Sequence, residues 1–199
     1  MIRKIYQIGE PLLYEKTKPV KDFNSDEVKS IIKDLIDTSV EEEERSAGLS
    51  ANQIGASLSI CVCRRMDLEE EGRKKHGKDF NLSRDKLWKV FINPKIINST
   101  KDKSVFWEGC LSVGEKEEDT LYGPVWRPED VEVEYYDEKG VKKTIEARGF
   151  FSHLVQHEID HLNGKLFVSQ VPNPEKNLWR STELEEYIKR EGEHPEIYK

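Results

Sequence analysis

The chain reads Gln156-His157-Glu158-Ile159-Asp160-His161-Leu162-Asn163-Gly164 in its C-terminal third. Apolar residues at helical spacing run through this stretch and predict a helix over 149–162, which the Asn-Gly pair ends. Two histidines four positions apart lie on one face of a helix, so both rings can reach one metal ion. The glutamate beside the first histidine can serve as a general base toward water. This H-E-x-x-H pattern therefore indicates metal-assisted hydrolysis.

A catalytic metal usually has three protein ligands, so the helix leaves one ligand to be found. One candidate is Cys110 in the stretch 107–112, where Gly109 allows a close backbone approach. The alternative is a glutamate on a later helix, for which Glu175 or Glu183 fits. A third histidine at the metzincin spacing is excluded because that position holds Phe167. The residues alone leave both ligand sets open.

The remaining histidines and cysteines have plainer interpretations. His153 lies one turn before the motif, where we expect it in the pocket wall rather than on the metal. His76 and His194 sit in polar sequence and are predicted to face solvent, while Cys61 and Cys63 alternate in a strand pattern and are predicted to be structural.

The remaining predicted elements are a helix over 26–43 capped from Asn24 to Glu27, strands over 58–64 and 90–93, a hairpin over 131–136 and 141–146, and a last helix over 174–191.

These elements show no regular alternation of strand and helix, which favours an α+β fold. We expect mixed or antiparallel sheets packed around the central helix that carries the two histidines, with a C-terminal helix. Residues 66–89 are densely charged and lack periodicity, so they are predicted to form a surface insertion that is helical around 67–75. The length of 199 residues fits one domain over 1–199.

Composition narrows the classes of function. Lys and Arg total 32 against 39 Asp and Glu, a net charge of −7, which disfavours DNA as a partner. The longest apolar runs are far shorter than the ~20 residues of a membrane helix, so no membrane span is expected. We see no signal-peptide pattern, and three cysteines are too few for a disulfide framework. The chain is therefore expected in the cytoplasm.

Three segments together resemble the motifs of the peptide deformylase family. They are Gly48-Leu49-Ser50-Ala51-Asn52-Gln53-Ile54-Gly55, Glu108-Gly109-Cys110-Leu111-Ser112 and the stretch 156–164. Their order and separation are similar to those of the family, and the likeness extends to 8–13, 91–94 and 164–167. It covers most of the chain outside about 67–89 and the tail.

The resemblance implies a ligand set, a mechanism and a reaction. Cys110, His157 and His161 would bind one divalent ion, Fe(II) in the native family enzyme, with Zn(II), Ni(II) or Co(II) as possible replacements. Glu158 would take a proton from water and pass it to the leaving amine. Gln53 and the backbone N–H of Leu111 would hold the oxyanion. The reaction would remove the N-formyl group from the N-terminal methionine of newly made polypeptides and release formate.

The resemblance also implies where the substrate lies. Gly48, Leu49 and Gly109 match positions whose backbone follows the substrate peptide, and His153 and Leu154 match walls of the methionine pocket. The partners implied are N-formylmethionyl peptides or nascent chains, bound by a monomer.

The chain departs from the family pattern at three positions near the motifs. Asn52 replaces a frequent proline and predicts a looser loop around Gln53 with a weaker methionine preference, while Ser46 and Gly114 replace a glycine and a proline.

Some relatives dock on the ribosome through a basic C-terminal helix, but residues 175–199 here hold five Lys or Arg against seven Glu, so we expect no such contact. Two other functions remain as alternatives, an H-E-x-x-H endopeptidase and a deformylase-like binding protein without turnover.

Overall fold

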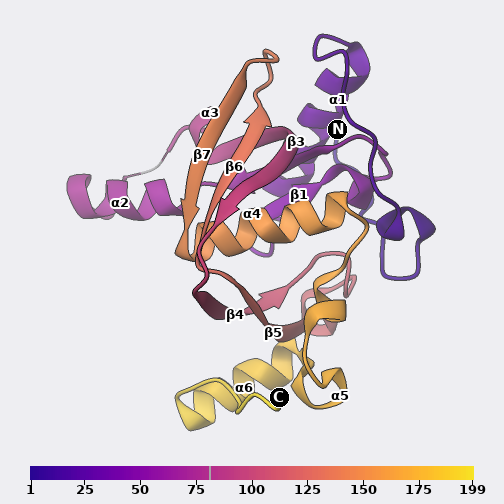
Figure 1. Cartoon of the computed structure of the whole chain (residues 1–199). Coiled ribbons are helices and arrows are strands. Elements are labelled where there is room, and N and C mark those ends of the chain that lie inside the picture. The colour runs from indigo at the N-terminus through magenta and orange to yellow at the C-terminus, as the bar shows by residue number, and fades with distance from the viewer. Residues whose placement is uncertain (81) are drawn as a thin grey trace.

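Figure 1 shows the computed structural model of the chain, which describes residues 1–80 and 82–199. Within these residues the strands form two antiparallel sheets, with helices between and around them. The strands are β1 (Gly48–Ser50), β2 (Ile60–Arg64), β3 (Trp88–Ser99), β4 (Lys103–Gly109), β5 (Leu121–Pro128), β6 (Asp130–Tyr136), β7 (Lys142–Arg148) and β8 (Trp179–Arg180). The α-helices are α1 (Asp26–Glu41), α2 (Met66–His76), α3 (Arg84–Leu87), α4 (Gly149–Leu162), α5 (Pro174–Asn177) and α6 (Ser181–Glu191). The fold is α+β, as the sequence predicted.

The larger sheet has the strand order β1-β2-β3-β6-β7, and the smaller sheet has the order β4-β5-β8. The two sheets therefore end in free edges at β1 and at β4. Both of these edge strands lead directly into the sequence motifs, because β1 precedes the 3₁₀ helix η2 (Ala51–Ile54) and β4 ends one residue before Cys110. The topology thus places two unpaired strand edges next to the predicted site.

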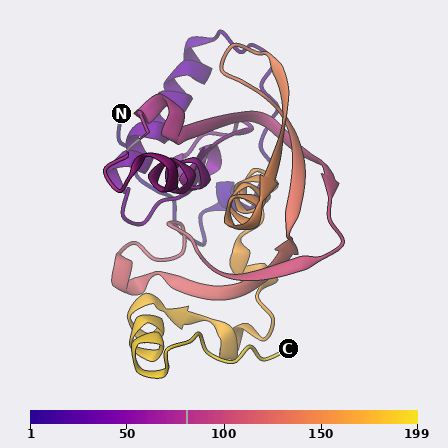
Figure 2. The same cartoon turned by 90° about the vertical axis from the view of Figure 1, so that its left-hand side faces the viewer.

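Helix α4 lies between the two sheets and contacts strands of both (Figure 1). Figure 2 looks along this helix, with the larger sheet curving over it and the smaller sheet beneath. Eleven of its fourteen residues are buried, because a helix covered on two sides can expose little of its surface. The helix spans 149–162 as predicted, and Gly164 follows with a φ of +74° that ends it.

Strand β2 shows how alternation builds the core on both faces of the larger sheet. Ile60 and Val62 face α1, whose apolar stripe includes Val28 and Leu35. The alternate residues Cys61 and Cys63 face α4 and are fully buried as free thiols. The prediction that these two cysteines are structural agrees with this placement.

Helix α1 begins one residue later than the predicted cap implied. The capping residue is Ser25, whose hydroxyl accepts a hydrogen bond from the Val28 amide at 3.3 Å, and Asn24 lies outside the helix. The helix ends at Glu41 rather than 43. Serine and asparagine cap comparably well, so the sequence could not decide between neighbouring candidates.

The prediction that Pro94 ends a strand over 90–93 is wrong. Strand β3 runs on to Ser99, with a bulge between Ile92 and Lys95 where it pairs with β6. Asn93 adopts a φ of +50° there, and its side chain bonds both the amide and the carbonyl of Val20 at 2.8 Å. A bulge leaves residues unpaired, so it can accommodate a proline that has no N–H to donate.

The charged segment is more ordered than an aperiodic insertion would be. The predicted helix around 67–75 is present as α2, and Glu69 on it is buried against Arg64 at 3.2 Å and Arg73 at 3.6 Å. The predicted end at 89 is too late, because Trp88 already belongs to β3 and is 3% exposed. Within the segment, Asn81 lies outside the described residues.

The single C-terminal helix predicted over 174–191 is also wrong. The chain forms the short helix α5, then β8, and only then α6. Asn177 interrupts the helix, because its buried side chain donates to the Pro172 carbonyl and to the Tyr198 carbonyl instead of facing solvent. Strand β8 then pairs with β5, which extends the smaller sheet. No helix in the described part of the chain is long and apolar enough to cross a membrane.

Candidate metal centre and active site

Three side chains converge between α4 and the smaller sheet. His157 and His161 project from α4, and Cys110 follows the end of β4. The ligand atoms of the three residues all lie within 4.8 Å of one another. The Nε2 atom of His161 is 3.2 Å from the Cys110 Sγ and 3.2 Å from the His157 Nε2. The structure thus brings together one of the two ligand sets that the sequence left open.

Glu108 fixes the orientation of the first histidine. Its Oε2 lies 2.9 Å from the Nδ1 of His157, which leaves the Nε2 of that ring facing the cluster. Arg127 on β5 holds the same carboxylate at 2.6 and 3.0 Å, and reaches Asp160 at 2.6 Å. A carboxylate behind a ligand histidine is the usual means by which proteins set its tautomer and raise its basicity.

Burial and mutual contacts shift the pKa values of the charged and titratable groups around the cluster. Burial disfavours ionisation of Glu108, but contacts with His153, His157 and Arg127 hold its pKa well below the ordinary value. Burial lowers the pKa of His157, yet Cys110 and Glu108 raise it well above the ordinary value. Burial and the neighbouring His157 lower the pKa of His161, which keeps that ring neutral and able to donate a lone pair.

These residues fit a divalent transition metal. One sulfur and two imidazole nitrogens are the donors that Fe(II), Zn(II), Co(II) and Ni(II) accept, and all three side chains are buried. The Nδ1 of His157 is already paired with a carboxylate, so its free nitrogen points into the cluster. Three protein ligands also leave a coordination position open, which is characteristic of catalytic rather than structural sites.

Glu158 lies beside the cluster in a closed setting. Its Oε2 accepts a hydrogen bond from the Ser50 hydroxyl at 2.7 Å, and burial raises its pKa to about 7. A Cβ at Gly48 would lie 2.5 Å from the Glu158 Oε1, so only glycine lets β1 approach this carboxylate. A carboxyl group with a pKa near neutrality can take up and release a proton readily.

Gln53 is held with its amide nitrogen toward Cys110. Its Oε1 accepts from the Ser50 amide at 2.8 Å, and its Nε2 donates to the Ser112 hydroxyl at 3.0 Å. The same nitrogen lies 3.5 Å from the Cys110 Sγ. The first contact is half of a capping box at the start of η2, so local helix chemistry positions this side chain.

Asn52, beside Gln53, makes a long-range contact that bears on the expected looseness of this loop. This asparagine is fully buried, and its Nδ2 donates to the backbone carbonyl of His161 at 2.6 Å. A side-chain hydrogen bond to α4 therefore takes over the restraint that a proline ring would give. The looser loop and the weaker methionine preference stay predictions, although the sequence could not reveal this long-range partner.

A cavity of about 230 Å³ opens above the cluster. Backbone from both sheet edges borders it, Ala47 and Gly48 on β1 and the stretch 106–110 on β4. Apolar and aromatic side chains make up much of the remaining wall. The lining includes Gln53, Phe106, Trp107, Leu111, Tyr122, Phe150, His153, Leu154, His157 and Glu158.

Most of the residues predicted at the site line this cavity, with one qualification. Gly48, Gly109, Leu111, His153 and Leu154 border it. His153 is buried, with its Nε2 3.0 Å from the Ser104 hydroxyl, so it belongs to the wall rather than to the ligand set. The side chain of Leu49 is instead fully buried in the core against α1, so only its backbone remains available at the β1 edge.

The alternative ligands lie elsewhere. Glu175 is on α5 and Glu183 is on α6, and both are exposed. Neither joins a cluster that could hold a metal among the described residues, where Cys110 and the two histidines form the group found. The endopeptidase-like ligand set is therefore not the one that the fold assembles.

Glu108 and Arg127 were missed as site residues. Glu108 stands two residues before Cys110, where strand alternation would place it on the face toward α4. That signal was present but required recognising β4 as a strand. Arg127 gave no local signal, because only the pairing of β4 with β5 brings it to Glu108.

The fold and this site define a metal-dependent hydrolase with one H-E-x-x-H helix between two sheets. Comparison with known proteins identifies the family. Residues 2–177 match the family described as polypeptide deformylase. The peptide deformylase of Rhizobium meliloti (strain 1021) is 32% identical over 177 residues, which are 89% of this chain and 89% of that protein. The peptide deformylase of Thermus thermophilus is 32% identical over 196 residues, covering 97% of this chain and 94% of that protein.

Solved structures of peptide deformylases are also similar to this chain. A crystal structure of a peptide deformylase from Legionella pneumophila has a TM-score of 0.69 at 30% identity, covering 98% of this chain and 100% of that chain. An actinonin-bound class I type b peptide deformylase from Acinetobacter baumannii has a TM-score of 0.68 at 26% identity, covering 86% of this chain and 99% of that chain. The chain belongs to the polypeptide deformylase family. It is therefore a hydrolase that removes the N-formyl group from newly made polypeptides, and the family is metal-dependent.

Proposed function

We propose that Cys110, His157 and His161 hold the metal in this enzyme and that Glu158 carries the proton. The observation that supports this most directly is the convergence of the three ligand atoms within 4.8 Å, beside a buried carboxylate. A divalent ion bound there would supply a Lewis acid that activates water and polarises the formyl carbonyl. Fe(II) is proposed as the native ion, with Zn(II), Ni(II) or Co(II) able to replace it. Metal analysis of protein purified without oxygen tests that identity.

Each step of the proposed reaction is assigned to particular residues of the chain. Water adds its oxygen to the formyl carbon while Glu158 takes up the proton that water gives up. Gln53, whose amide nitrogen faces Cys110, and the backbone N–H of Leu111 donate hydrogen bonds to the oxygen that becomes negative. The C–N bond breaks, Glu158 returns its proton to the amine, and formate and a free N-terminus result.

The substrate is proposed to lie extended between the free edges of β1 and β4. Both edge strands border the cavity, and a free strand edge offers unpaired N–H and C=O groups to an extended peptide. Gly48, Leu49 and Gly109 would contribute backbone to this pairing. The methionine side chain would enter the part of the cavity that is lined by Phe106, His153 and Leu154.

The reaction is tested by the choice among substrates. An acetyl group adds a methyl beside the reacting carbon, and one extra methyl in a close-fitting site costs about 1–3 kcal/mol. We expect formyl-Met-Ala-Ser to release formate far faster than acetyl-Met-Ala-Ser releases acetate, and casein to remain uncut. Cleavage of casein without formate release would support an endopeptidase, while metal binding without either activity would support the binding-protein alternative.

The setting of the enzyme is also proposed. The chain is expected to form a single catalytic domain over 1–199 and to act as a monomer in the cytoplasm on formylmethionyl nascent chains. Three free, buried cysteines agree with a reducing compartment. Sedimentation of the purified protein tests the monomer.

A further inference from the structure

The face of the smaller sheet that turns away from α4 carries its own aromatic side chains. In an antiparallel pair, residues directly opposite each other lie on the same face. Trp107 pairs with Pro124 and Gly109 pairs with Tyr122, so Trp107 and Tyr122 share the outer face. Phe106 lies on the inner face, where its ring is 4.4 Å from that of His153. Strand β4 thus presents one aromatic ring toward α4 and another away from it.

The C-terminal segment 192–199 folds back onto this outer face. After α6, Gly192 adopts a φ of +82° and turns the chain, and Pro195 is buried. Asn177 holds the far end through both backbone groups of Tyr198, donating to its carbonyl at 2.7 Å and accepting from its amide at 3.0 Å. The Lys176 amine lies 5.1 Å above the Tyr198 ring. The segment is therefore anchored at its end, independently of the residues in its middle.

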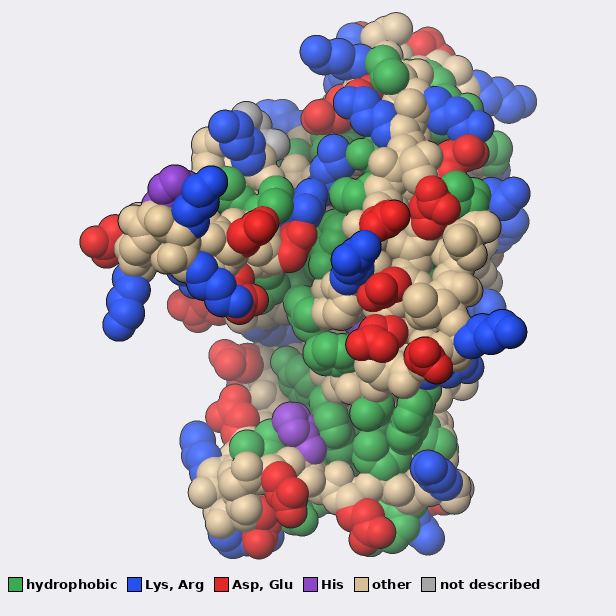
Figure 3. Space-filling model, turned by 60° about the vertical axis from the view of Figure 1, so that its left-hand side comes forward, with side chains coloured by type: hydrophobic (Ala, Val, Ile, Leu, Met, Phe, Trp, Pro, Cys, Tyr) green, Lys and Arg blue, Asp and Glu red, His purple; other side chains and the backbone are tan. Residues whose placement is uncertain are grey.

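Anchoring the segment places His194 against Trp107. The two rings are stacked, with centroids 5.5 Å apart and planes 23° from parallel. His194 is otherwise exposed, as its polar sequence predicted, and Trp107 is half-buried and lines the active-site cavity. Figure 3 views this part of the molecule, where hydrophobic side chains gather above the C-terminal helix with a histidine at their edge.

The alternating side chains of an extended substrate connect the Trp107–His194 pair to substrate specificity. Successive side chains of an extended peptide point to opposite sides. If the methionine side chain points toward Phe106 and His153, the next side chain points toward the face that carries Trp107. We propose that Trp107, backed by His194, forms the subsite for the residue that follows the formylmethionine and favours an aromatic or large apolar side chain there. This proposal rests on the proposed substrate path, and the family match ends at residue 177, before the segment that carries His194.

The test compares two formyl peptides in the wild-type enzyme and in variants. An aromatic pair contributes enough to change an equilibrium about two- to tenfold, so the wild type should show a KM for formyl-Met-Phe-Ser lower than that for formyl-Met-Ala-Ser by about that factor. His194→Ala and removal of 193–199 should raise the KM for the phenylalanine peptide toward that of the alanine peptide. The kcat values and the metal content should stay as in the wild type, because neither change touches the ligands, Glu158 or Gln53.

Two further variants separate this role from a general effect on stability. His194→Phe retains a ring to stack on Trp107 and should keep the preference. His76→Ala removes the other exposed histidine that stacks on an aromatic ring, that of Phe80 at 5.3 Å, and should change neither peptide. A preference that survives both His194→Ala and Trp107→Ala, or a wild type without preference, would overturn the subsite. Absence of formate release from both peptides in the metal-loaded wild type would overturn the proposed function and the subsite together.

Discussion

Glu158 depends on two small neighbours for its position. Gly48 leaves room for its carboxylate and Ser50 donates a hydrogen bond to it, while burial raises its pKa to about 7. The carboxylate proposed to carry the proton is thus positioned by β1 as well as by its own helix. In the proposed mechanism, binding of the metal and transfer of the proton depend on different side chains, which can be altered separately.

Glu158→Gln should separate these two steps. Glutamine keeps the shape of the side chain but cannot take a proton from water, so turnover should fall by about 10²–10⁴-fold. Metal content should remain close to that of the wild type, because Cys110 and both histidines are unchanged. Formate release and metal analysis on the same preparation give the two readings. Turnover that remains normal in this variant would exclude Glu158 as the proton carrier.

Cys110→Ala should remove metal and activity together. Two imidazoles alone leave the ion with too few protein ligands, and the sulfur also brings negative charge to the cluster. Cys63→Ala is the matched control, since Cys63 is also a buried free thiol but faces the core against α4. That control should retain its metal. If Cys110→Ala retained full metal content while Glu183→Ala lost it, the glutamate ligand set would be correct.

The site could be predicted from the sequence as far as its motifs reach. His157, His161 and Glu158 follow from helical spacing, and Cys110 and Gln53 follow from the family resemblance. Glu108 and Arg127 could not be placed, because their 2.6 Å contact depends on the register between β4 and β5. The Asn52 contact with the His161 carbonyl likewise joins residues that are 109 positions apart. The proposed metal ligands lie in short motifs that can be recognised in the sequence. The groups that orient them are brought into place only by strand pairing and other tertiary contacts.

At the scale of elements, the alternation of apolar and polar residues predicted the strands that have only one covered face. The β6–β7 hairpin is the clearest case, with Asp137 through Gly140 forming its turn. Strands β4 and β5 were missed for physical reasons. β4 carries adjacent aromatic residues because both of its faces are partly covered, and β5 contains a glycine and two prolines, which are unusual within a sheet. Helix α4 was found at its correct bounds because its apolar pattern and its terminal Asn-Gly agree.

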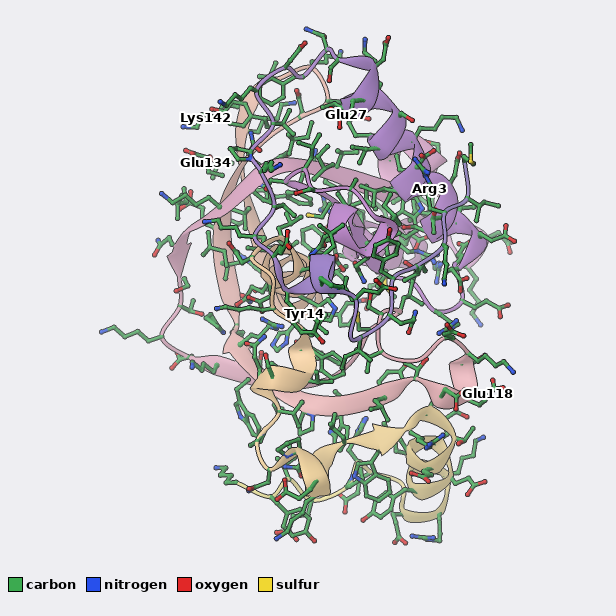
Figure 4. The ribbon with its side chains drawn as sticks, turned by 90° about the vertical axis from the view of Figure 1, so that its right-hand side faces the viewer. Arg3, Tyr14, Glu27, Glu118, Glu134 and Lys142 are labelled. Carbon is green, nitrogen blue, oxygen red and sulfur yellow. The ribbon has the colours of Figure 1, made fainter. Side chains whose placement is uncertain are left out.

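The hairpin also offers a test of acid stability. Asp137 pairs with Lys143 at 2.9 Å and accepts hydrogen bonds from the amides of Val141 and Lys139 at 2.9 Å, and these contacts lower its pKa to about 2. Figure 4 shows the neighbouring pair Lys142 and Glu134, 2.8 Å apart, on the same hairpin. Because the pKa of Asp137 is lower in the folded state, its charge stabilises the fold above the ordinary value of 3.8, and this stabilisation is lost as pH falls toward 2.

Asp137→Asn should therefore lower the melting temperature at neutral pH. Asparagine keeps an oxygen that can accept from the turn amides but loses the charge that faces Lys143. The difference from the wild type should shrink as the pH falls from about 5 toward about 2, because the wild-type carboxylate becomes increasingly protonated over this range. Glu138→Gln, at the exposed neighbouring position, is the control and should follow the wild type. A constant difference across this range would show that the charge of Asp137 does not stabilise the hairpin.

At the scale of the whole molecule, the active site exists only where the two sheets meet. α4 carries two of the proposed ligands and the proposed base, β4 leads to Cys110, and β1 leads to Gln53, and Figure 1 labels these three elements. The free edges of β1 and β4 lie on either side of the same cavity. Neither sheet alone could form the proposed metal and substrate sites, which agrees with the wide separation of the three motifs in the sequence.

The outer surface of the smaller sheet leads to a last prediction, on ribosome binding. α6 carries four glutamates and two basic side chains, Lys189 and Arg190, both of which lie next to carboxylates of their own helix. RNA binding draws on free cations that displace counterions from phosphates, so this surface should be repelled by RNA at ordinary salt. The C-terminal segment is moreover used within the molecule, where its His194 stacks on Trp107. Co-sedimentation with ribosomes should show no binding that weakens with added salt, and removal of 178–199 should leave the result unchanged. Salt-sensitive binding that is lost on this truncation would show that the tail docks despite its charge.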